Sequence, residues 1–139
     1  MFDPLLASIR VAGTGLQAQS HRVRVVSENI ANKDSTGNTP GSNPYTRKTI
    51  TFAGDFDSEL GAMAVRIDRI DTDRSPYTID HDPGNPAADA NGNVKRPNVN
   101  MLVELADIRE ANRSYEANLQ VVKQARAMIG MTIDLMRSN

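Results

Sequence analysis

Residues 101–136 read MLVELADIREANRSYEANLQVVKQARAMIGMTIDLM and contain no proline. Apolar side chains recur in this stretch at alternating steps of four and three residues, the 3.5-residue period of a helix that packs along one seam. Asn112 and Arg126 are the two polar residues within the period. We therefore predict a helix that is capped at Asn98 or Asn100 and runs for about 38 residues, or roughly 57 Å. Its predicted seam residues are Leu105, Ile108, Tyr115, Leu119, Val122, Ile129 and Ile133.

A second long helix is predicted at the start of the chain. Asp3 is a favoured N-cap residue, and Pro4 suits the first helical position, where a missing N–H costs nothing. The helix should extend for about 28 residues, or roughly 42 Å, and end at the polar stretch 32–38 (NKDSTGN). It repeats the 3.5-residue period with one polar interruption, Gln19. Its predicted seam residues are Leu5, Ile9, Leu16, Val23, Val26 and Ile30.

The middle of the chain has a different character, since six of the seven Pro and six of the nine Gly lie within residues 37–97. Apolar and polar side chains alternate in Thr46–Ala53 and in Met63–Asp71, which predicts two short, half-buried strands. Asp80–Pro97 is rich in turn-forming residues and is predicted to be an extended loop.

These elements predict a mainly α fold. The long N- and C-terminal helices should form an antiparallel coiled-coil hairpin, and the middle segment should be mostly irregular with short β-strands. The predicted division is a coiled-coil assembly domain built from residues 1–32 and 97–139, with a loop- and β-rich segment at 33–96. The predicted seam would hold the two helices of the subunit together.

Each helix also carries a second apolar stripe, about 200° round from its seam. A helix that only closes a pair should be polar there. Residues 1–32 carry only five charged side chains, so burying their surface against a neighbour would desolvate little charge. We therefore expect the second stripes to pack against neighbouring subunits; the alternative is that they pack on the middle segment of the same chain. The stripe residues are Val11, Ala18, Val25, Val121, Met128 and Leu135.

Composition excludes several function classes. The chain has 139 residues, no cysteine and a formal net charge of −1, so disulfides, thiolate chemistry and a basic nucleic-acid footprint are not expected. It has no run of about 20 apolar residues for membrane insertion and no secretory leader at its start. Asp80-His81-Asp82 would splay its side chains if extended and reads as a solvated turn rather than a metal site. Asp71–Ser75 begins like a calcium loop, but Pro76 stands where that loop needs glycine. No catalytic constellation is present, so we expect neither an enzyme nor a cofactor.

Short motifs at the helix ends point to a family. SENIAN at residues 27–32 resembles the S-x-N-I-A-N signature of the flagellar axial proteins, the rod, hook and hook-associated subunits, and YTRK at 45–48 resembles the motif that follows it. Residues 82–100, Glu104 and residues 111–118 resemble the proximal rod subunits of that family; Asn85 and Asn93 depart from its usual residues. The motif residues are Ser27, Asn29, Ile30, Ala31, Asn32, Tyr45, Arg47, Lys48, Pro97, Asn98, Val99, Asn112, Arg113, Tyr115 and Asn118.

This resemblance implies a structural subunit of the bacterial flagellar basal-body proximal rod, which polymerises through its terminal helices to build the drive shaft. It implies partners of three kinds: copies of the chain itself, rod subunits of the FlgB and FlgF types with FliE at the base, and the flagellar type III export apparatus. It also implies a periplasmic rod location, reached without a cleaved signal peptide. The residues alone leave a second hypothesis open, a helical-hairpin adaptor or secretion chaperone that binds one partner groove.

Overall fold

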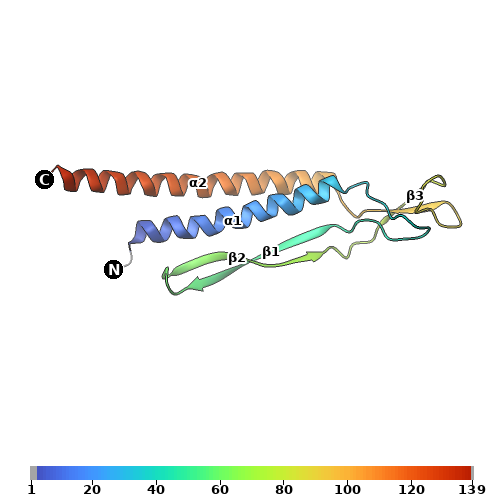
Figure 1. Ribbon diagram of the computed structural model, residues 1–139, viewed down its shortest axis with the longest axis horizontal. Helices are drawn as coiled ribbons and strands as arrows, with labels where there is room; N and C mark the ends of the chain where they lie inside the picture. Colours follow the sequence, from blue (N-terminus) through green and yellow to red (C-terminus); the bar gives the residue numbers. More distant parts are fainter. Residues whose placement is uncertain (1–2, 139) are drawn as a thin grey trace. The chain divides into compact units, whose positions relative to one another are not determined.

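The computed structural model describes residues 3–138, which form two long helices joined by two β-hairpins (Figure 1). The helices account for almost half of the chain, so the prediction of a mainly helical fold with short strands in the middle is confirmed. The elements in chain order are α1 (Pro4–Ala31), β1 (Lys48–Asp57), β2 (Ala62–Thr72), β3 (Thr78–His81), β4 (Asn93–Arg96) and α2 (Met101–Arg137).

Both helices begin at the side chains that the sequence favours as caps. The backbone N–H of Leu5 donates to Asp3 Oδ1 at 2.9 Å, and that of Leu102 donates to Asn100 Oδ1 at 3.0 Å. These bonds satisfy N–H groups that have no partner within the helix. Of the two candidate caps for α2, Asn100 is therefore the one used, because the Asn98 side chain is engaged elsewhere.

The β-structure is more extensive than predicted. β1 begins two residues after the expected start of the strand Thr46–Ala53 and ends four residues beyond it, and β2 extends the expected strand Met63–Asp71 by one residue at each end. The two strands pair as a two-stranded sheet. The turn between them is closed by Asp57, whose Oδ1 accepts the N–H of Glu59 at 2.9 Å and that of Leu60 at 3.1 Å. Asp side chains commonly stabilise turns by such hydrogen bonds to the backbone. β1 therefore ends at Asp57, and β2 begins at Ala62 after the turn.

The prediction of an extended loop at Asp80–Pro97 is correct for residues 82–92, but it missed the strands on both sides of them. β3 and β4 pair antiparallel there, with Thr78 opposite Arg96 and His81 opposite Asn93. Between them the chain reverses through turns that end at Gly92, which has a φ of 77°. The proline and glycine residues that suggested an open loop instead form the turn that makes this hairpin possible.

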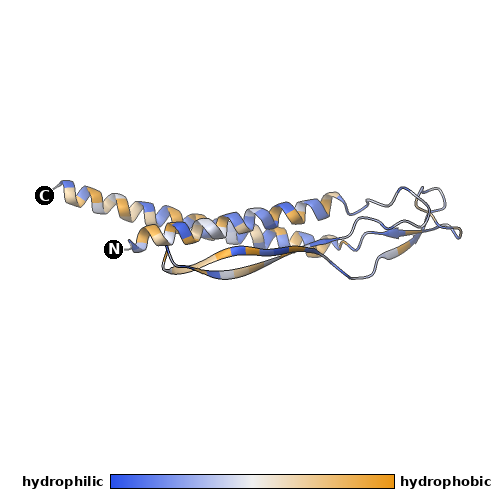
Figure 2. Cartoon of the chain, turned by 60° about the horizontal axis from the view of Figure 1, so that its bottom comes forward, coloured by the Kyte–Doolittle hydropathy of each residue, from blue (hydrophilic) through white to orange (hydrophobic). Residues whose placement is uncertain are grey.

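The contacts divide the chain into two compact units. The first contains the described residues up to Val23, Thr51–Arg69 and those from Arg109 onward; the second contains Arg24–Ile50 and Ile70–Ile108. In the first unit the start of α1, the α2 residues and the β1–β2 hairpin lie beside one another, and the two helices run in opposite directions (Figures 1 and 2).

Small side chains hold the first unit together. Ala12, Ala18, Ala111 and Ala125 are among its most buried residues. The hairpin is tied to α1 by the Val65 N–H, which donates to Thr14 Oγ1 at 3.1 Å. Small residues allow backbones to approach closely, but each buries little apolar area, so this core stabilises the fold only modestly.

Gly15 and Gly13 provide a matched test of this close packing. A Cβ at Gly15 would lie 2.8 Å from Asn118 Nδ2, whereas a Cβ at Gly13 would meet nothing within 4 Å. Gly13→Ala should raise the free energy of unfolding by about 0.5–1 kcal/mol through helix propensity. Gly15→Ala should lose this gain because Asn118 must move. Urea unfolding measures both, and equal stabilisation by the two variants would contradict the packing described.

Candidate assembly site: a buried polar cluster and an exposed apolar helix face

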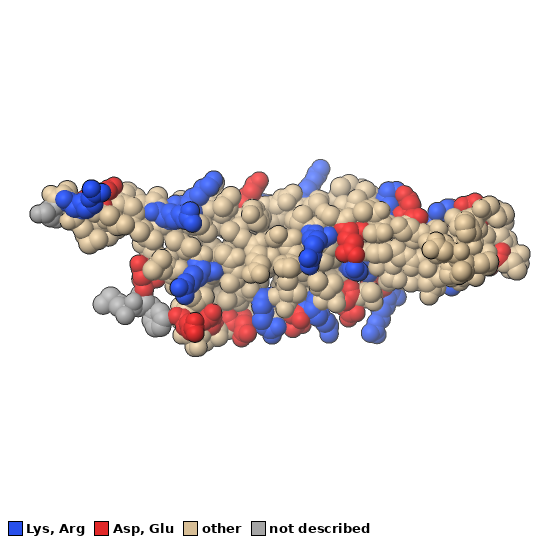
Figure 3. Space-filling model, in the orientation of Figure 1, with Lys and Arg blue, Asp and Glu red and all other residues tan. Residues whose placement is uncertain are grey.

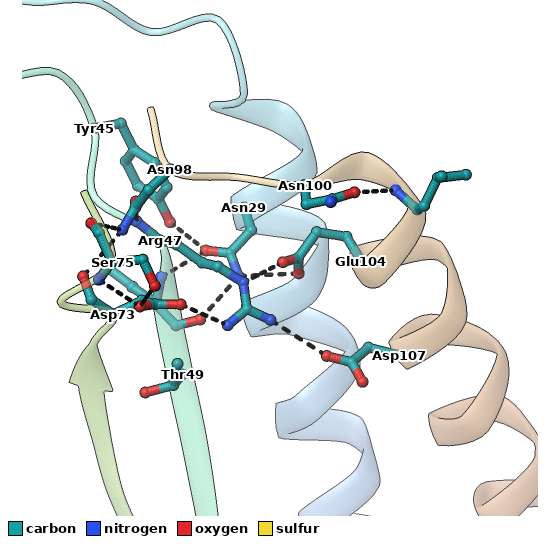
Figure 4. A network of polar contacts seen from close by, with 12 residues as sticks. Asn29, Tyr45, Arg47, Thr49, Asp73, Ser75, Asn98, Asn100, Glu104 and Asp107 are labelled. Atoms are coloured by element: carbon teal, nitrogen blue, oxygen red, sulfur yellow. Dashed lines mark hydrogen bonds and ion pairs between the residues drawn. The ribbon is translucent and has the colours of Figure 1, made fainter. Parts of the chain in front are cut away.

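The second unit contains a buried polar cluster that begins with Asn29 in the last turn of α1 (Figure 4). Asn29 is 1% exposed, and its side-chain amide makes four hydrogen bonds. Nδ2 donates to the Lys48 carbonyl at 2.9 Å and to Glu104 Oε2 at 3.1 Å, while Oδ1 accepts from Tyr45 Oη and the Lys48 N–H, both at 2.8 Å. Two donors and two acceptor sites are all that an asparagine amide offers. An aspartate here would lose both donors and face the Glu104 carboxylate.

Glu104, in the first turn of α2, is the most deeply buried charged residue of the cluster, with no exposed surface. Its Oε1 accepts from Arg47 Nε, and its Oε2 accepts from Asn29. A buried carboxylate is tolerated only when it is paired and hydrogen-bonded. Arg47 and Asn29 together provide that compensation.

Arg47 extends the cluster to two further carboxylates. Nη1 lies 3.3 Å from Asp73 Oδ2, and Nη2 lies 3.5 Å from Asp107 Oδ2. The backbone of Arg47 makes two further hydrogen bonds. Its N–H donates to Asn98 Oδ1 at 2.8 Å, and its carbonyl accepts the Asp73 N–H at 2.8 Å. We refer to Asn29, Tyr45, Arg47, Asp73, Asn98, Glu104 and Asp107 as the Arg47 cluster.

Three members of the cluster have shifted pKa values. Burial of Arg47 by itself would lower its pKa, but hydrogen bonds and charge from Glu104 and Asp73 outweigh burial and raise it. The pKa of Asp73 is lowered by hydrogen bonds from the Ser75 side chain and backbone, with help from Arg47. The pKa of Tyr45 is raised by burial and by the nearby charges of Glu28 and Glu104. The geometry thus keeps Arg47 and Asp73 charged.

The first group of motif residues converges on this cluster. Asn29, Tyr45, Arg47 and Asn98 come from three separate stretches of sequence, and Lys48 adds an ion pair with Glu28 at 2.5 Å. Asn32 instead closes the end of α1, where its Nδ2 donates to the Glu28 carbonyl at 2.9 Å. Pro97 is buried and Val99 half-buried beside the cluster, whereas Ser27 and Ala31 are exposed.

The second group of motif residues lies on α2 in the first unit and is largely exposed. Asn112, Arg113 and Tyr115 face solvent, while Asn118 is half-buried against Gly15. Arg126, the other polar residue in the predicted seam, is exposed too. Whether Asn112 and Arg126 set the register of a partner helix stays a prediction.

Most of the predicted seam residues are half-buried in the single subunit. Val26 is buried, whereas Leu105, Tyr115 and Ile133 are exposed; the half-buried residues are Leu5, Ile9, Leu16, Val23, Ile30, Ile108, Leu119, Val122 and Ile129. On α2 the innermost line is instead Glu104, Ala111, Asn118 and Ala125, spaced by seven residues. The inward face is therefore rotated by about one residue from the predicted seam. Small or hydrogen-bonded side chains occupy its centre, and the large apolar ones flank it.

The second stripes differ between the helices, and the prediction for α1 needs correction. Ala18 and Val25 are each 3% exposed, so these two stripe residues are covered within the chain, whereas Val11 is only half-buried. Ala18 lines a small pocket together with Val65 and Ile67 of β2, which is the packing on the middle segment that the sequence left as the alternative. On α2, by contrast, Val121, Met128 and Leu135 are all exposed.

Sequence reasoning missed Asp73 and the central place of Glu104. The only signal in the sequence was Glu104 itself, an acidic residue in the first turn of the predicted C-terminal helix that belongs to the family motifs.

At Asp80-His81-Asp82, both carboxylates pair with Arg96, at 3.2 and 3.5 Å, and no group suited to a metal occurs within residues 3–138. Charges of both signs are interspersed over the face seen in Figure 3.

Among the described residues no helix is long and apolar enough to cross a membrane.

The buried polar cluster and the exposed apolar face of α2 are features of a structural subunit that assembles with neighbours. Comparison with known proteins agrees. Residues 9–41 match the family described as "Flagella basal body rod protein", and residues 90–135 match "Flagellar basal body rod FlgEFG protein C-terminal". The chain is 55% identical over 137 residues to the flagellar basal-body rod protein FlgC of Agrobacterium fabrum, covering 99% of both chains.

Two further relatives carry the same name. The FlgC proteins of Salmonella typhimurium and Borreliella burgdorferi are each 38% identical, over 94% and 96% of this chain and 97% and 98% of theirs. The chain belongs to the FlgC family of flagellar basal-body rod proteins. It is a structural subunit of the basal-body rod that assembles with other rod components, and it is not an enzyme. This membership decides against the adaptor or chaperone hypothesis.

Arg47→Ala should destabilise the chain by about 3–5 kcal/mol because it leaves the Glu104 carboxylate buried without its charge partner. The matched control is Arg66→Ala, which breaks exposed pairs with Asp55 and Asp68 and should cost less than about 1 kcal/mol. Chemical denaturation of both variants gives the comparison. Similar losses of unfolding free energy for the two variants would show that the cluster stabilises the chain no more than an exposed ion pair does.

Stability in acid should depend on Asp73. Its folded-state pKa lies below the ordinary value of 3.8, so the ionised side chain stabilises the fold above that pH, and the contribution is lost as the pH falls through the lowered value. Asp73→Asn should therefore be less stable than the unmodified chain at pH 7 but lose less stability between roughly pH 5 and 2. The free energy of unfolding at several pH values tests this. Parallel pH profiles for the two proteins would rule out the assigned role.

Proposed function

We propose that this rod subunit polymerises through its two terminal helices into the wall of the proximal rod and so forms part of the drive shaft. In this proposal the helices pack as an antiparallel coiled coil, residues 1–32 and 97–139 build the assembly domain, and residues 33–96 set the tilt between neighbours. The observation that carries the proposal is the apolar character of the C-terminal third of α2. Met128, Met131 and Leu135 are 51%, 59% and 67% exposed in the single subunit.

Exposed apolar residues that recur along one helix are typical of a surface that another protein covers. Val121 of the second stripe lies on the same face of α2, seven residues before Met128, and is exposed too. Leu105, Tyr115 and Ile133 of the predicted seam are also exposed, but they lie on another side of the helix. Figure 2 shows apolar residues continuing along α2 to its C-terminal end. Burying a Leu or Met side chain stabilises an interface by about 1.5–3 kcal/mol, so a few such residues from each neighbour suffice for assembly.

The proposed partners are copies of the chain, rod subunits of the FlgB and FlgF types, and FliE at the base. The proposed route is export through the flagellar type III apparatus without a cleaved signal peptide, followed by assembly in the periplasm. The core supports this route, because it consists mainly of alanine, valine and a polar cluster. A chain with so small an apolar core unfolds at modest cost.

Met128→Asp combined with Leu135→Asp tests the proposal. These exposed positions should accept aspartate without loss of the fold, as judged by circular dichroism, while incorporation into basal bodies should fall at least about tenfold because two charges would be desolvated at the interface. The matched control is Met128→Leu with Leu135→Met, which conserves volume and should incorporate normally. Normal incorporation and motility of the aspartate variant would contradict the proposal.

A further inference from the structure

The first unit contains an open apolar groove of about 410 Å³ that nothing within residues 3–138 fills. Small side chains form most of its wall, and it contains no charged residue. The lining residues are Ala7, Ser8, Val11, Ala12, Ala62, Asn118 and Val121. A groove lined by alanine and serine has space for large side chains from outside.

The C-terminal part of α2 carries side chains of the kind that the groove lacks. Met128, Met131 and Leu135 are spaced by three and four residues, so they lie on one face of the helix and project into solvent. Methionine adapts its shape readily to an irregular apolar surface.

We propose that the groove of one subunit receives residues 127–136 of α2 from a second copy of the chain. This inference rests on the proposed function and names the contact through which two copies would meet. Large, exposed side chains of the donor segment would fill the space between the small residues of the acceptor. The exposed apolar surface of both would be removed from water.

Charge supports the same pairing. Asp134 is the only charged residue in segment 127–136, and it is exposed. Arg10 is exposed on α1, one residue before Val11 and three after Ala7, at the flank of the groove. Within the described part of the chain neither side chain forms an ion pair. A donor segment bound in the groove would place its Asp134 near Arg10 of the acceptor copy.

The contact has a consequence for the form of the assembly. The donor segment and the acceptor groove are different surfaces, so a pair of subunits joined once retains a free groove on one copy and a free segment on the other. Repetition of a head-to-tail contact that does not close a ring gives an open helical array. A rod requires an array of this kind.

Disulfide cross-linking tests the contact cleanly because the chain has no cysteine. Cells that carry both a Ser8→Cys and a Leu135→Cys copy should give basal bodies in which oxidation links the two, with a yield at least about tenfold above a Ser8→Cys and Glu110→Cys control. A copy with both changes should give a ladder of linked subunits. Products that stop at two copies would contradict the head-to-tail contact.

Charge exchange gives a second, independent test. Arg10→Glu and Asp134→Arg should each reduce incorporation about fivefold in competition with the unmodified chain, and the double exchange should return it to within about twofold. Normal incorporation of the cysteine variants without a cross-link, together with silent charge exchanges, would overturn the groove contact and leave the proposed function intact. Failure of the unmodified chain to enter basal bodies would instead contradict the proposed function.

Discussion

A carboxylate without exposed surface sits in the first turn of α2, and the second unit is organised around its neutralisation. Glu104 needs a cation and a hydrogen-bond donor within reach, and Arg47 and Asn29 supply them. Such a group of buried charges adds little stability over an apolar packing of the same volume, yet removal of any one partner is costly. Its effect is geometric: it fixes where α1 ends, where β1 begins and where α2 begins, because each of these points contributes one member.

The first unit depends on a different constraint, the use of small residues. Ala12, Gly15, Ala111 and Ala125 let neighbouring backbones approach, but they leave large apolar side chains at the edges rather than in the centre. Much of the apolar surface of α2 is then uncovered in the single subunit. For a member of a rod-forming family this is consistent with function, since the surface left open in the subunit is available to neighbours.

The sequence predicts the helices and their caps because periodicity and capping are local. It predicts the face of α2 only to within about one residue, because the pattern gives weight to large apolar residues such as Leu105 and Tyr115, while Ala111 and Asn118 lie innermost. The hairpin of β3 and β4 and the coverage of Ala18 by β2 depend on pairing between distant segments. The motifs identify Asn29, Arg47 and Asn98 as family residues, but only the fold shows that they meet at Glu104, since no local pattern encodes that contact.

We infer that the Arg47 cluster stabilises the second unit, while the apolar end of α2 becomes stable on assembly. Native-state hydrogen exchange compares the two regions directly. In the free subunit the amides of residues 102–108 should be well protected and those of residues 121–138 weakly protected; in assembled rods the latter should become strongly protected. Strong protection of residues 121–138 in the free subunit, unchanged on assembly, would contradict the account.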